Sequence, residues 1–260
     1  LVGTDLLSLR QVSCDASTAG SCRNGLHIAL LVETAPYLDL TAYKDDEAYD
    51  ARYSATQRKR RKKSRKSLEA LGAIEFRILP NGSASDAAMA EAIAEKNKWL
   101  QERGRQNRIL KCPAHLKFLV GLSRAAKSGV EMVTSELRAG GRPISWEIGF
   151  NFHGVHFAYI TSHVNALTDL SPGRLHMDLS QRHCLAQGLK KFDLMVPNDQ
   201  HKESWSSGFV ETSDYYIPMT AIGSLYGKVH PRTHRPIVRR PHHRRPGRAR
   251  KRLKPLLRDG

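Results

Sequence analysis

The segment from residue 130 to residue 161 constrains the fold of this chain more than any other, because it predicts three consecutive strands joined by tight turns. Gly140-Gly141 and His153-Gly154 are dipeptides that readily adopt the positive φ angles of two-residue hairpin turns. Three successive antiparallel strands favour a domain built on a central, mainly antiparallel sheet. The strands expected around these turns cover residues 130–137, 143–152 and 155–161.

The middle strand of this set indicates which side of the sheet meets the core. Apolar and polar residues alternate along residues 143–152, as they do in a strand whose two faces have different surroundings. The residues expected on the apolar face are Ile144, Trp146, Ile148, Phe150 and Phe152. Those expected on the opposite face are Ser145, Glu147 and Asn151.

Helices and further strands are predicted on both sides of this segment. Their expected ends follow from glycines placed to stop a helix, and from capping residues and prolines placed to start one. The predicted helices cover residues 45–71, 85–103, 113–127 and 171–187. The other predicted strands cover residues 26–32, 73–79, 192–196 and 209–219. We therefore expect an α/β (α+β) fold in which helices flank a mixed, mainly antiparallel central sheet.

The positive charge of the chain is concentrated in two short segments. The chain has 42 Lys and Arg against 25 Asp and Glu, a formal net charge of +17. The run from Arg58 to Lys66 contains eight basic residues and no acid, and residues 227–260 contain thirteen basic residues and one acid. The rest of the chain is therefore slightly acidic, which argues against a chain-wide basic groove for nucleic acid. We expect an anionic partner at residues 58–66 and 227–260, and we expect residues 227–260 to be disordered.

Cysteine usage and hydropathy bear on the compartment of the protein. Cys14, Cys22, Cys112 and Cys184 form no CxxC pair, so we expect reduced, mostly buried thiols and a cytoplasmic protein. We expect no transmembrane segment, because no apolar stretch approaches the length of a membrane span, and no signal peptide, because no charged n-region precedes an apolar stretch. The chain begins with Leu1 instead of methionine, which suggests a fragment of a longer protein.

Three histidines lie around the second hairpin turn. His156 and His163 have opposite parity along the predicted strand, so we expect their side chains on opposite faces of the sheet. We therefore expect no metal bound between them and His153, because metal ligands must converge. His163, where the strand ends, is a candidate general base.

The segment Ser171-Pro172-Gly173-Arg174 is a candidate phosphate-binding site. Ser171 is a suitable helix N-cap, Pro172 suits the first helical position, and Gly173 allows close approach of a ligand to the backbone. Arg174 adds a cation beside the positive end of the helix. The same residues also fit a well-capped helix with no ligand.

A second candidate site follows the next strand. Asp193 lies on that strand, and the polar loop beyond it contains His201, Lys202 and Trp205. A tryptophan in a polar loop indicates a pocket wall or a ligand contact. The alternative is that Trp205 folds back over the edge of the sheet.

Taken together, these residues resemble the C-terminal half of the GNAT-type acyltransferases grouped with the cellulose-biosynthesis protein CelD. The resemblance runs from about residue 38 to residue 219. In that family a Ser-Pro-Gly starts a helix, a glycine precedes a strand ending in Asp and an aromatic or apolar residue, and a Tyr-Lys-x-x-Trp-like element follows. The matching residues here are Ser171-Pro172-Gly173, Gly188, Asp193-Leu194, and Lys202 with Trp205.

The resemblance implies tandem GNAT-like halves, as in the Fem-type aminoacyltransferases. Residues 1–72 would be the remnant of a first half that ends in the basic helix, and residues 73–226 would be the acyltransferase domain. It also implies an acyl-CoA co-substrate without a metal, with the pyrophosphate at Ser171, Gly173 and Arg174.

The implied reaction is direct transfer of an acyl group to an amine or hydroxyl, on a saccharide or envelope polysaccharide precursor. In this interpretation His163 and Asp193 are the catalytic residues, and Lys202 and Trp205 bind the acceptor. The alternative is a non-catalytic nucleic-acid or polyanion-binding protein that uses the run from Arg58 to Lys66 and the basic tail.

Overall fold

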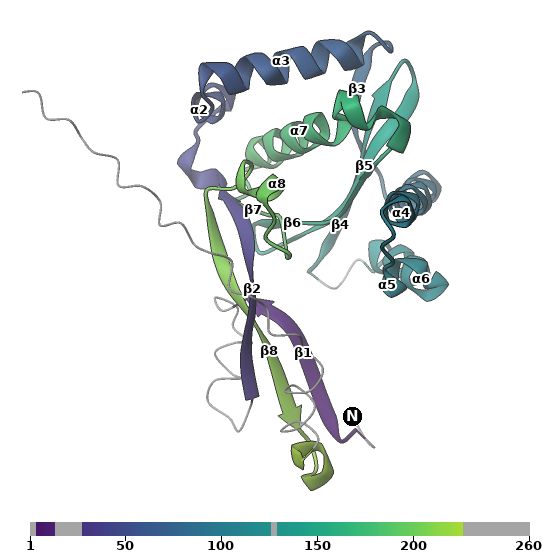
Figure 1. The fold of residues 1–260 in the computed structure, drawn as a ribbon, viewed down its shortest axis with the longest axis vertical. Coiled ribbons are helices and arrows are strands. Elements are labelled where there is room, and N and C mark those ends of the chain that lie inside the picture. Colours follow the sequence, from purple (N-terminus) through teal and green to yellow (C-terminus); the bar gives the residue numbers. More distant parts are fainter. Residues whose placement is uncertain (1–3, 14–27, 126–128, 226–260) are drawn as a thin grey trace, which may run out of the picture.

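The computed structural model describes residues 4–13, 28–125 and 129–225 and arranges them around one eight-stranded sheet (Figure 1). The strand order is β1-β8-β2-β7-β6-β5-β4-β3, and every neighbouring pair is antiparallel except β6 and β7. This confirms the predicted fold class, a mixed and mainly antiparallel sheet with flanking helices. The strands are β1 (Leu6–Ser13), β2 (Ile28–Asp39), β3 (Ile74–Leu79), β4 (Glu131–Ala139), β5 (Arg142–Phe152), β6 (Val155–His163), β7 (Lys191–Asp193) and β8 (Gly208–Pro218).

The helices cover both faces of the sheet. Figure 1 shows α4, α5 and α6 on one side of β4 and β5, with α7 and then α3 on the other. The α-helices are α2 (Asp46–Ala51), α3 (Ala55–Glu69), α4 (Ser83–Glu102), α5 (Arg108–Lys111), α6 (Pro113–Ser123), α7 (Pro172–Ala186) and α8 (Gln200–Glu203). Two 3-10 helices, η1 (Leu40–Ala42) and η2 (Asn165–Leu170), precede α2 and α7. None of the helices in the described ranges is long and apolar enough to cross a membrane.

Both predicted hairpin turns are present. Gly140 and Gly141 have φ angles of 56° and 75°, and His153 and Gly154 have 49° and 77°. These left-handed angles match the right-handed twist of the flanking strands, so the turns fix the order β4-β5-β6.

A β-bulge in β6 changes which residues share a face. Ile148 pairs with Ile160 and Gly149 pairs with Ala158, so Tyr159 is an extra residue. The bulge reverses the parity of β6 at that point. His156 and His163 therefore lie on the same face of the sheet, and the prediction that they point to opposite faces was wrong.

A second irregularity, between β4 and β5, moves Ile144. Leu137 pairs with Ser145 and Arg138 pairs with Pro143, which leaves Ile144 without a partner in β4. Ile144 joins a core cluster on the α7 side, whereas Trp146, Ile148 and Phe150 pack beneath α4 and α6 as expected. Phe152, also expected on the apolar face, is 40% exposed.

The predicted helix over residues 45–71 is two helices, α2 and α3. Asp45 caps α2, and a new N-cap at Ser54 starts α3. Ser54 accepts from the backbone of Gln57, whose side chain accepts from the backbone of Ser54. This capping box satisfies the backbone N–H groups of Ser54 and Gln57. A new helix therefore begins after Ser54, and α2 and α3 are separate.

The N-terminal segment belongs to the same sheet as the rest of the chain. β2 pairs with β8 along most of its length and with β7 at its end. Residues on both sides of position 72 therefore share one sheet, and the origin of residues 1–72 as the remnant of a first half stays a prediction.

Some predictions concern residues outside the described ranges. They include the predictions made for residues 227–260 and for Cys14 and Cys22. Of the two described cysteines, Cys184 is a buried free thiol as expected, whereas Cys112 is exposed.

Candidate active site

The start of α7 positions the predicted phosphate-binding residues. Pro172 occupies the first helical turn as expected, but the Ser171 side chain does not cap the helix. Ser171 is left-handed, with φ 58° and ψ 49°, because η2 ends directly before it and its N–H donates to the carbonyl of Thr168. Ser171 is thus a tight junction between two helices, and its predicted N-cap hydrogen bond is absent.

A cavity of about 480 Å³, here called the inner cavity, lies beside this junction. It is bounded by the ends of β5 and β6, the first turn of α7, α4 and the α8 region. Five of the seven predicted site residues line it, and they come from segments far apart in the sequence. They are His163, Ser171, Gly173, Arg174 and Lys202.

His163 is a half-buried imidazole at the end of β6. Burial, together with the charges of Lys96 and Arg103, lowers its pKa below the ordinary value, so the ring is neutral near pH 7. Its Nε2 lies 3.3 Å from the hydroxyl of Thr168, whose own hydrogen is donated to the carbonyl of Asn165. Nε2 therefore carries the proton, and Nδ1 keeps a free lone pair.

Gly173 lies beside Nδ1 of His163. A Cβ added to Gly173 would lie 3.4 Å from His163 Nδ1, in van der Waals contact with the imidazole. The absent side chain leaves room for a substrate between the imidazole and the start of α7.

Lys202 lines the inner cavity, but its ammonium group already has partners. Nζ donates to the carbonyls of Met195 and Pro197, both at 3.0 Å. Burial is the main cause that lowers the pKa of Lys202. The side chain therefore closes the loop between β7 and α8 and presents its charge to the cavity from a fixed position.

Asp193 is buried and does not line the inner cavity. Its Oδ1 accepts from the backbone N–H of Met195 at 2.8 Å. Because the carbonyl of Met195 accepts from Lys202, Asp193 is connected to the cavity through the loop instead of facing it.

A buried polar layer beneath α7 was missed in the sequence interpretation. Glu147 Oε1 lies 3.1 Å from His156 Nε2, and both side chains are almost fully buried. Burial raises the pKa of Glu147, but the hydrogen bond and charge of His156 outweigh burial and bring the pKa below its ordinary value. The only sequence signal was a carboxylate between apolar residues in a strand.

His176 is the other buried ionisable group in this layer. Its Nε2 is 2.7 Å from the Ser135 hydroxyl, and its Nδ1 is 3.1 Å from that of Ser145. Ser145 donates its hydrogen to the carbonyl of Ser162, so it accepts from Nδ1–H. Burial lowers the pKa of His176 to about 4, which keeps the ring neutral.

A second cavity, here called the basic groove, lies between α3 and α7 and measures about 540 Å³. Seven basic side chains and two carboxylates are among its lining residues. Ser171 and Arg174 line both the groove and the inner cavity.

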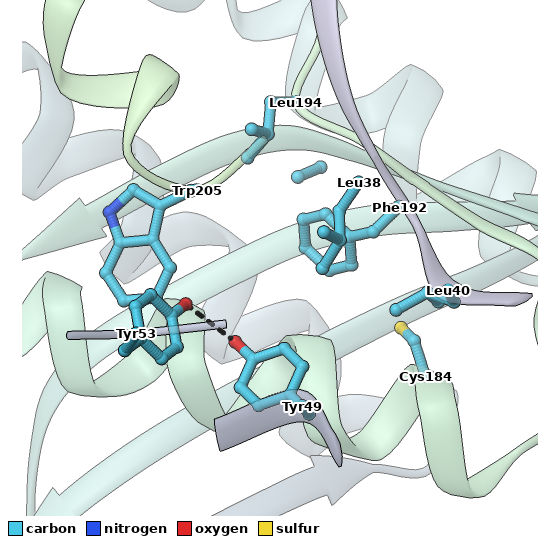
Figure 2. Close-up of a cluster of buried hydrophobic side chains, with 9 residues drawn as sticks. Leu38, Leu40, Tyr49, Tyr53, Cys184, Phe192, Leu194 and Trp205 are labelled. Carbon is cyan, nitrogen blue, oxygen red and sulfur yellow. Dashed lines mark hydrogen bonds between the residues drawn. The ribbon is translucent and has the colours of Figure 1, made fainter. Parts of the chain in front are cut away.

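Trp205 belongs to a buried core cluster and also lines the basic groove. It is 1% exposed and meets Tyr53 edge to face, with ring centres 6.4 Å apart (Figure 2). Its backbone carbonyl accepts from Gln181 at 3.1 Å. The role of Trp205 in binding an acceptor stays a prediction.

The described residues contain no group of three or more His, Cys, Asp or Glu side chains arranged to hold a metal ion. Although His156 and His163 share a face, the partners of His156 are Glu147 and Asn151. Besides His163, the inner cavity is lined by the start of α7, by the cations Lys96, Arg174 and Lys202, and by the carboxylates Glu147 and Asp199.

Comparison with known proteins places the chain in a family. A model described as Acetyltransferase (GNAT) domain matches residues 55–203, more than half of the chain. The chain belongs to this family and is a GNAT-type acyltransferase domain. No curated protein matches it in sequence.

Solved structures show the same fold at very low sequence identity. FemX has a TM-score of 0.55 at 8% identity, covering 87% of this chain and 74% of that one. L-PGS from Bacillus licheniformis has a TM-score of 0.52 at 10% identity, covering 86% and 73%. A conserved protein of unknown function from Bacteroides thetaiotaomicron has a TM-score of 0.54 at 6% identity, covering 81% and 69%.

Proposed function

We propose that this protein transfers an acyl group from acyl-CoA directly to an amine or hydroxyl at the inner cavity. The observation that carries the proposal is the separation of the one parallel strand pair. β6 and β7 pair only over Val155–Phe157 and Lys191–Asp193, although β6 continues to His163. The backbone of β6 beyond Phe157 therefore faces the cavity side without a β7 partner in the described chain, and its amides are suited to hold a thioester carbonyl.

The residues at the start of α7 fit the phosphates of such a donor. Arg174 is an exposed cation beside the positive end of the helix, and Gly173 lets the backbone approach a ligand. Three residues that line the inner cavity have a buried polar atom with no hydrogen-bond partner in the described chain, Trp146 Nε1, Glu147 Oε2 and Ser162 Oγ. Buried polar atoms without partners are uncommon and are often completed by a ligand or water.

His163 is the proton acceptor in this proposal. Its neutral ring and free Nδ1 can take the proton of the attacking amine or hydroxyl, a contribution of about 10²–10⁴-fold. Most of the acceleration would come from holding the two substrates together. Asp193 acts as a positioning residue, since it fixes Met195 and through it Lys202.

The acceptor and the location of the protein are inferred from the resemblance to the CelD-like proteins. We propose a saccharide or envelope polysaccharide precursor as acceptor, with Lys202 and Trp205 on its side of the site, and a cytoplasmic location. A second candidate function, binding of a nucleic acid or other polyanion without catalysis, is favoured by the excess of cations in the basic groove.

Acetyl-CoA titration of the full chain tests the proposal. We expect acetyl-CoA or a longer acyl-CoA to raise the melting temperature, and Arg174→Glu to remove the shift. Arg105→Glu, at an exposed position outside both cavities, is the matched control and should keep the shift. No shift with any acyl-CoA would rule out the donor.

Duplex DNA titrated at several salt concentrations separates the two functions. Steeply salt-dependent DNA binding without any acyl-CoA binding would favour the polyanion-binding function.

A further inference from the structure

The basic groove is built by the way α3 lies across α7. Arg61, Ser64 and Leu68 recur at the spacing of one helical face. The Ser64 hydroxyl donates to the carbonyl of Leu170 at 2.9 Å, Leu68 is buried, and the Arg61 guanidinium lies 2.7 Å from Asp178 on α7. The eight basic residues of the run therefore do not form a uniformly solvated face.

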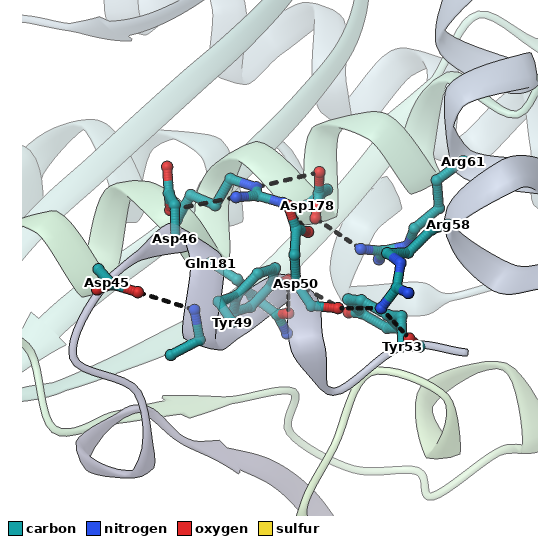
Figure 3. Close-up of polar contacts among 11 residues, drawn as sticks. Asp45, Asp46, Tyr49, Asp50, Tyr53, Arg58, Arg61, Asp178 and Gln181 are labelled. Carbon is teal, nitrogen blue, oxygen red and sulfur yellow. Dashed lines mark hydrogen bonds and ion pairs between the residues drawn. The ribbon is translucent and has the colours of Figure 1, made fainter. Parts of the chain in front are cut away.

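Three of the arginines that line the groove have a carboxylate partner, and one of them is Arg65, which lies 2.9 Å from Glu69. Arg61 is held by Asp178, and Arg182 contacts Asp46, Asp50 and Asp178 (Figure 3). The Arg61 guanidinium also lies 3.7 Å from the centre of the Tyr53 ring and is only 19% exposed. These side chains form a rigid floor whose charges are paired.

The remaining cations of the groove have no such balance. In residues 28–125 and 129–225, Arg58, Arg60, Lys62 and Arg174 line the groove and form no ion pair with a carboxylate. The Arg58 guanidinium donates a hydrogen bond to the backbone carbonyl of Tyr53. Four like charges around one cavity repel one another, and an anion between them would relieve this repulsion.

Trp205 supplies a second and independent observation. Its indole Nε1 is buried and has no hydrogen-bond acceptor in the described chain. A buried N–H without an acceptor is costly, and a ligand oxygen in the groove would satisfy it. The unpaired cations favour an anionic occupant of the groove, and the indole N–H favours one that carries acceptor oxygens.

We propose that the basic groove binds the phosphate groups of a substrate, either a phosphate monoester or a diphosphate. Guanidinium groups match phosphate oxygens in geometry and charge. Because Ser171 and Arg174 line both cavities, a molecule with its phosphates in the groove can extend into the inner cavity. This assignment to a substrate rests on the proposed acyl transfer. The phosphates belong to the nucleotide end of the donor or to a phosphorylated acceptor.

Pyrophosphate binding to the full chain tests the groove itself. Arg60→Gln with Lys62→Gln removes two groove cations, and Lys59→Gln with Lys63→Gln removes the same charge from exposed positions of α3 outside the groove. By calorimetric titration we expect the first double variant to bind pyrophosphate about tenfold more weakly, and the control to change by less than about threefold. Circular dichroism and melting temperature verify that both variants are folded.

The proposal is wrong if pyrophosphate does not bind, if both double variants weaken binding equally, or if neither weakens it. It is also wrong if only polynucleotides bind. A third outcome separates the two proposals. If acetyl-CoA does not bind but pyrophosphate binding still depends on Arg60 and Lys62, the donor assignment is wrong and the groove assignment stands.

Acetyl-CoA and acetylpantetheine distinguish the two sources of phosphate. If the groove holds the donor, the Arg60 and Lys62 double variant weakens acetyl-CoA binding and leaves acetylpantetheine binding unchanged. If the groove holds the acceptor, acetyl-CoA binds both proteins equally, and pyrophosphate binds the acetyl-CoA complex as well as the free protein.

Discussion

The phenol of Tyr49 donates a hydrogen bond of 2.8 Å to Oε1 of Gln181, and both side chains are buried (Figure 3). Gln181 makes a second hydrogen bond, in which its Nε2 donates to the backbone carbonyl of Trp205. Burial is the main cause that raises the pKa of Tyr49, so the phenol stays protonated and remains a donor. Two hydrogen bonds therefore connect Trp205, which lines the basic groove, through Gln181 on α7 to Tyr49 on α2.

Tyr49→Phe should destabilise the fold, because it leaves Gln181 Oε1 buried without this donor. We expect a loss of about 1–3 kcal/mol in the free energy of unfolding, measured in urea. Tyr159→Phe removes a hydroxyl at a site 37% exposed to solvent and should cost much less. Equal losses in the two variants would contradict the role of the Tyr49–Gln181 bond.

His163→Asn should lower kcat/KM for acyl transfer by about 10²–10⁴-fold without unfolding the protein. His153→Asn, at an exposed turn residue with positive φ that asparagine tolerates, is the control and should keep full activity. Because the pKa of His163 is lowered, the acidic limb of the wild-type pH–rate profile should lie below pH 6.5. An unchanged profile in His163→Asn would assign the base elsewhere.

The buried contact between Glu147 and His156 should matter more than an exposed pair. Glu147→Gln should cost about 1–3 kcal/mol, because it disturbs a polar contact between two buried side chains. Glu69→Gln breaks the exposed pair with Arg65 and should cost at most about 1 kcal/mol. Chemical unfolding of both variants at pH 7 measures the difference, and similar costs would show that the buried contact contributes no more than the exposed one.

Acid should destabilise the protein through His176. Its pKa is 6.5 in the unfolded chain and about 4 in the folded one, so the unfolded state binds more protons between these values. The stability is complete above pH 6.5 and is lost as the pH falls toward 4, by about 3 kcal/mol in total. Unfolding at pH 7, 5.5 and 4.5 should show a shallower decline in His176→Gln. A decline as steep as that of wild type would mean that other groups cause it.

The two hairpins and the start of α7 could be predicted because their signals are local. Gly140-Gly141 and His153-Gly154 determine two turns, and the helix start at Pro172 is marked by its own dipeptide. These features need no knowledge of distant contacts. The candidate site residues were separate proposals in the sequence, and only the fold brings five of them to one cavity.

The features that sequence did not predict depend on long-range packing. Tyr159 carries no mark of a bulge, yet its insertion brings His156 and His163 to one face. Glu147 is in an alternating strand, but only the coverage by α7 decides that its face is buried. The junction at Ser171 depends on η2, a short 3-10 helix that has no local signal in the sequence.

The pairing of β2 with β8 sets an order of events during synthesis. Tyr37 pairs with Gly208 and Ala35 with Val210, so the segment made early must wait for almost the whole described chain before its hydrogen bonds can form. Contacts this distant in sequence form late and leave strand edges exposed in the interim. On the ribosome, the hairpins of β4, β5 and β6 can form before β8 has been synthesised. Until β8 emerges, β2 lacks this partner, and its exposed edges must be kept from pairing with other strands.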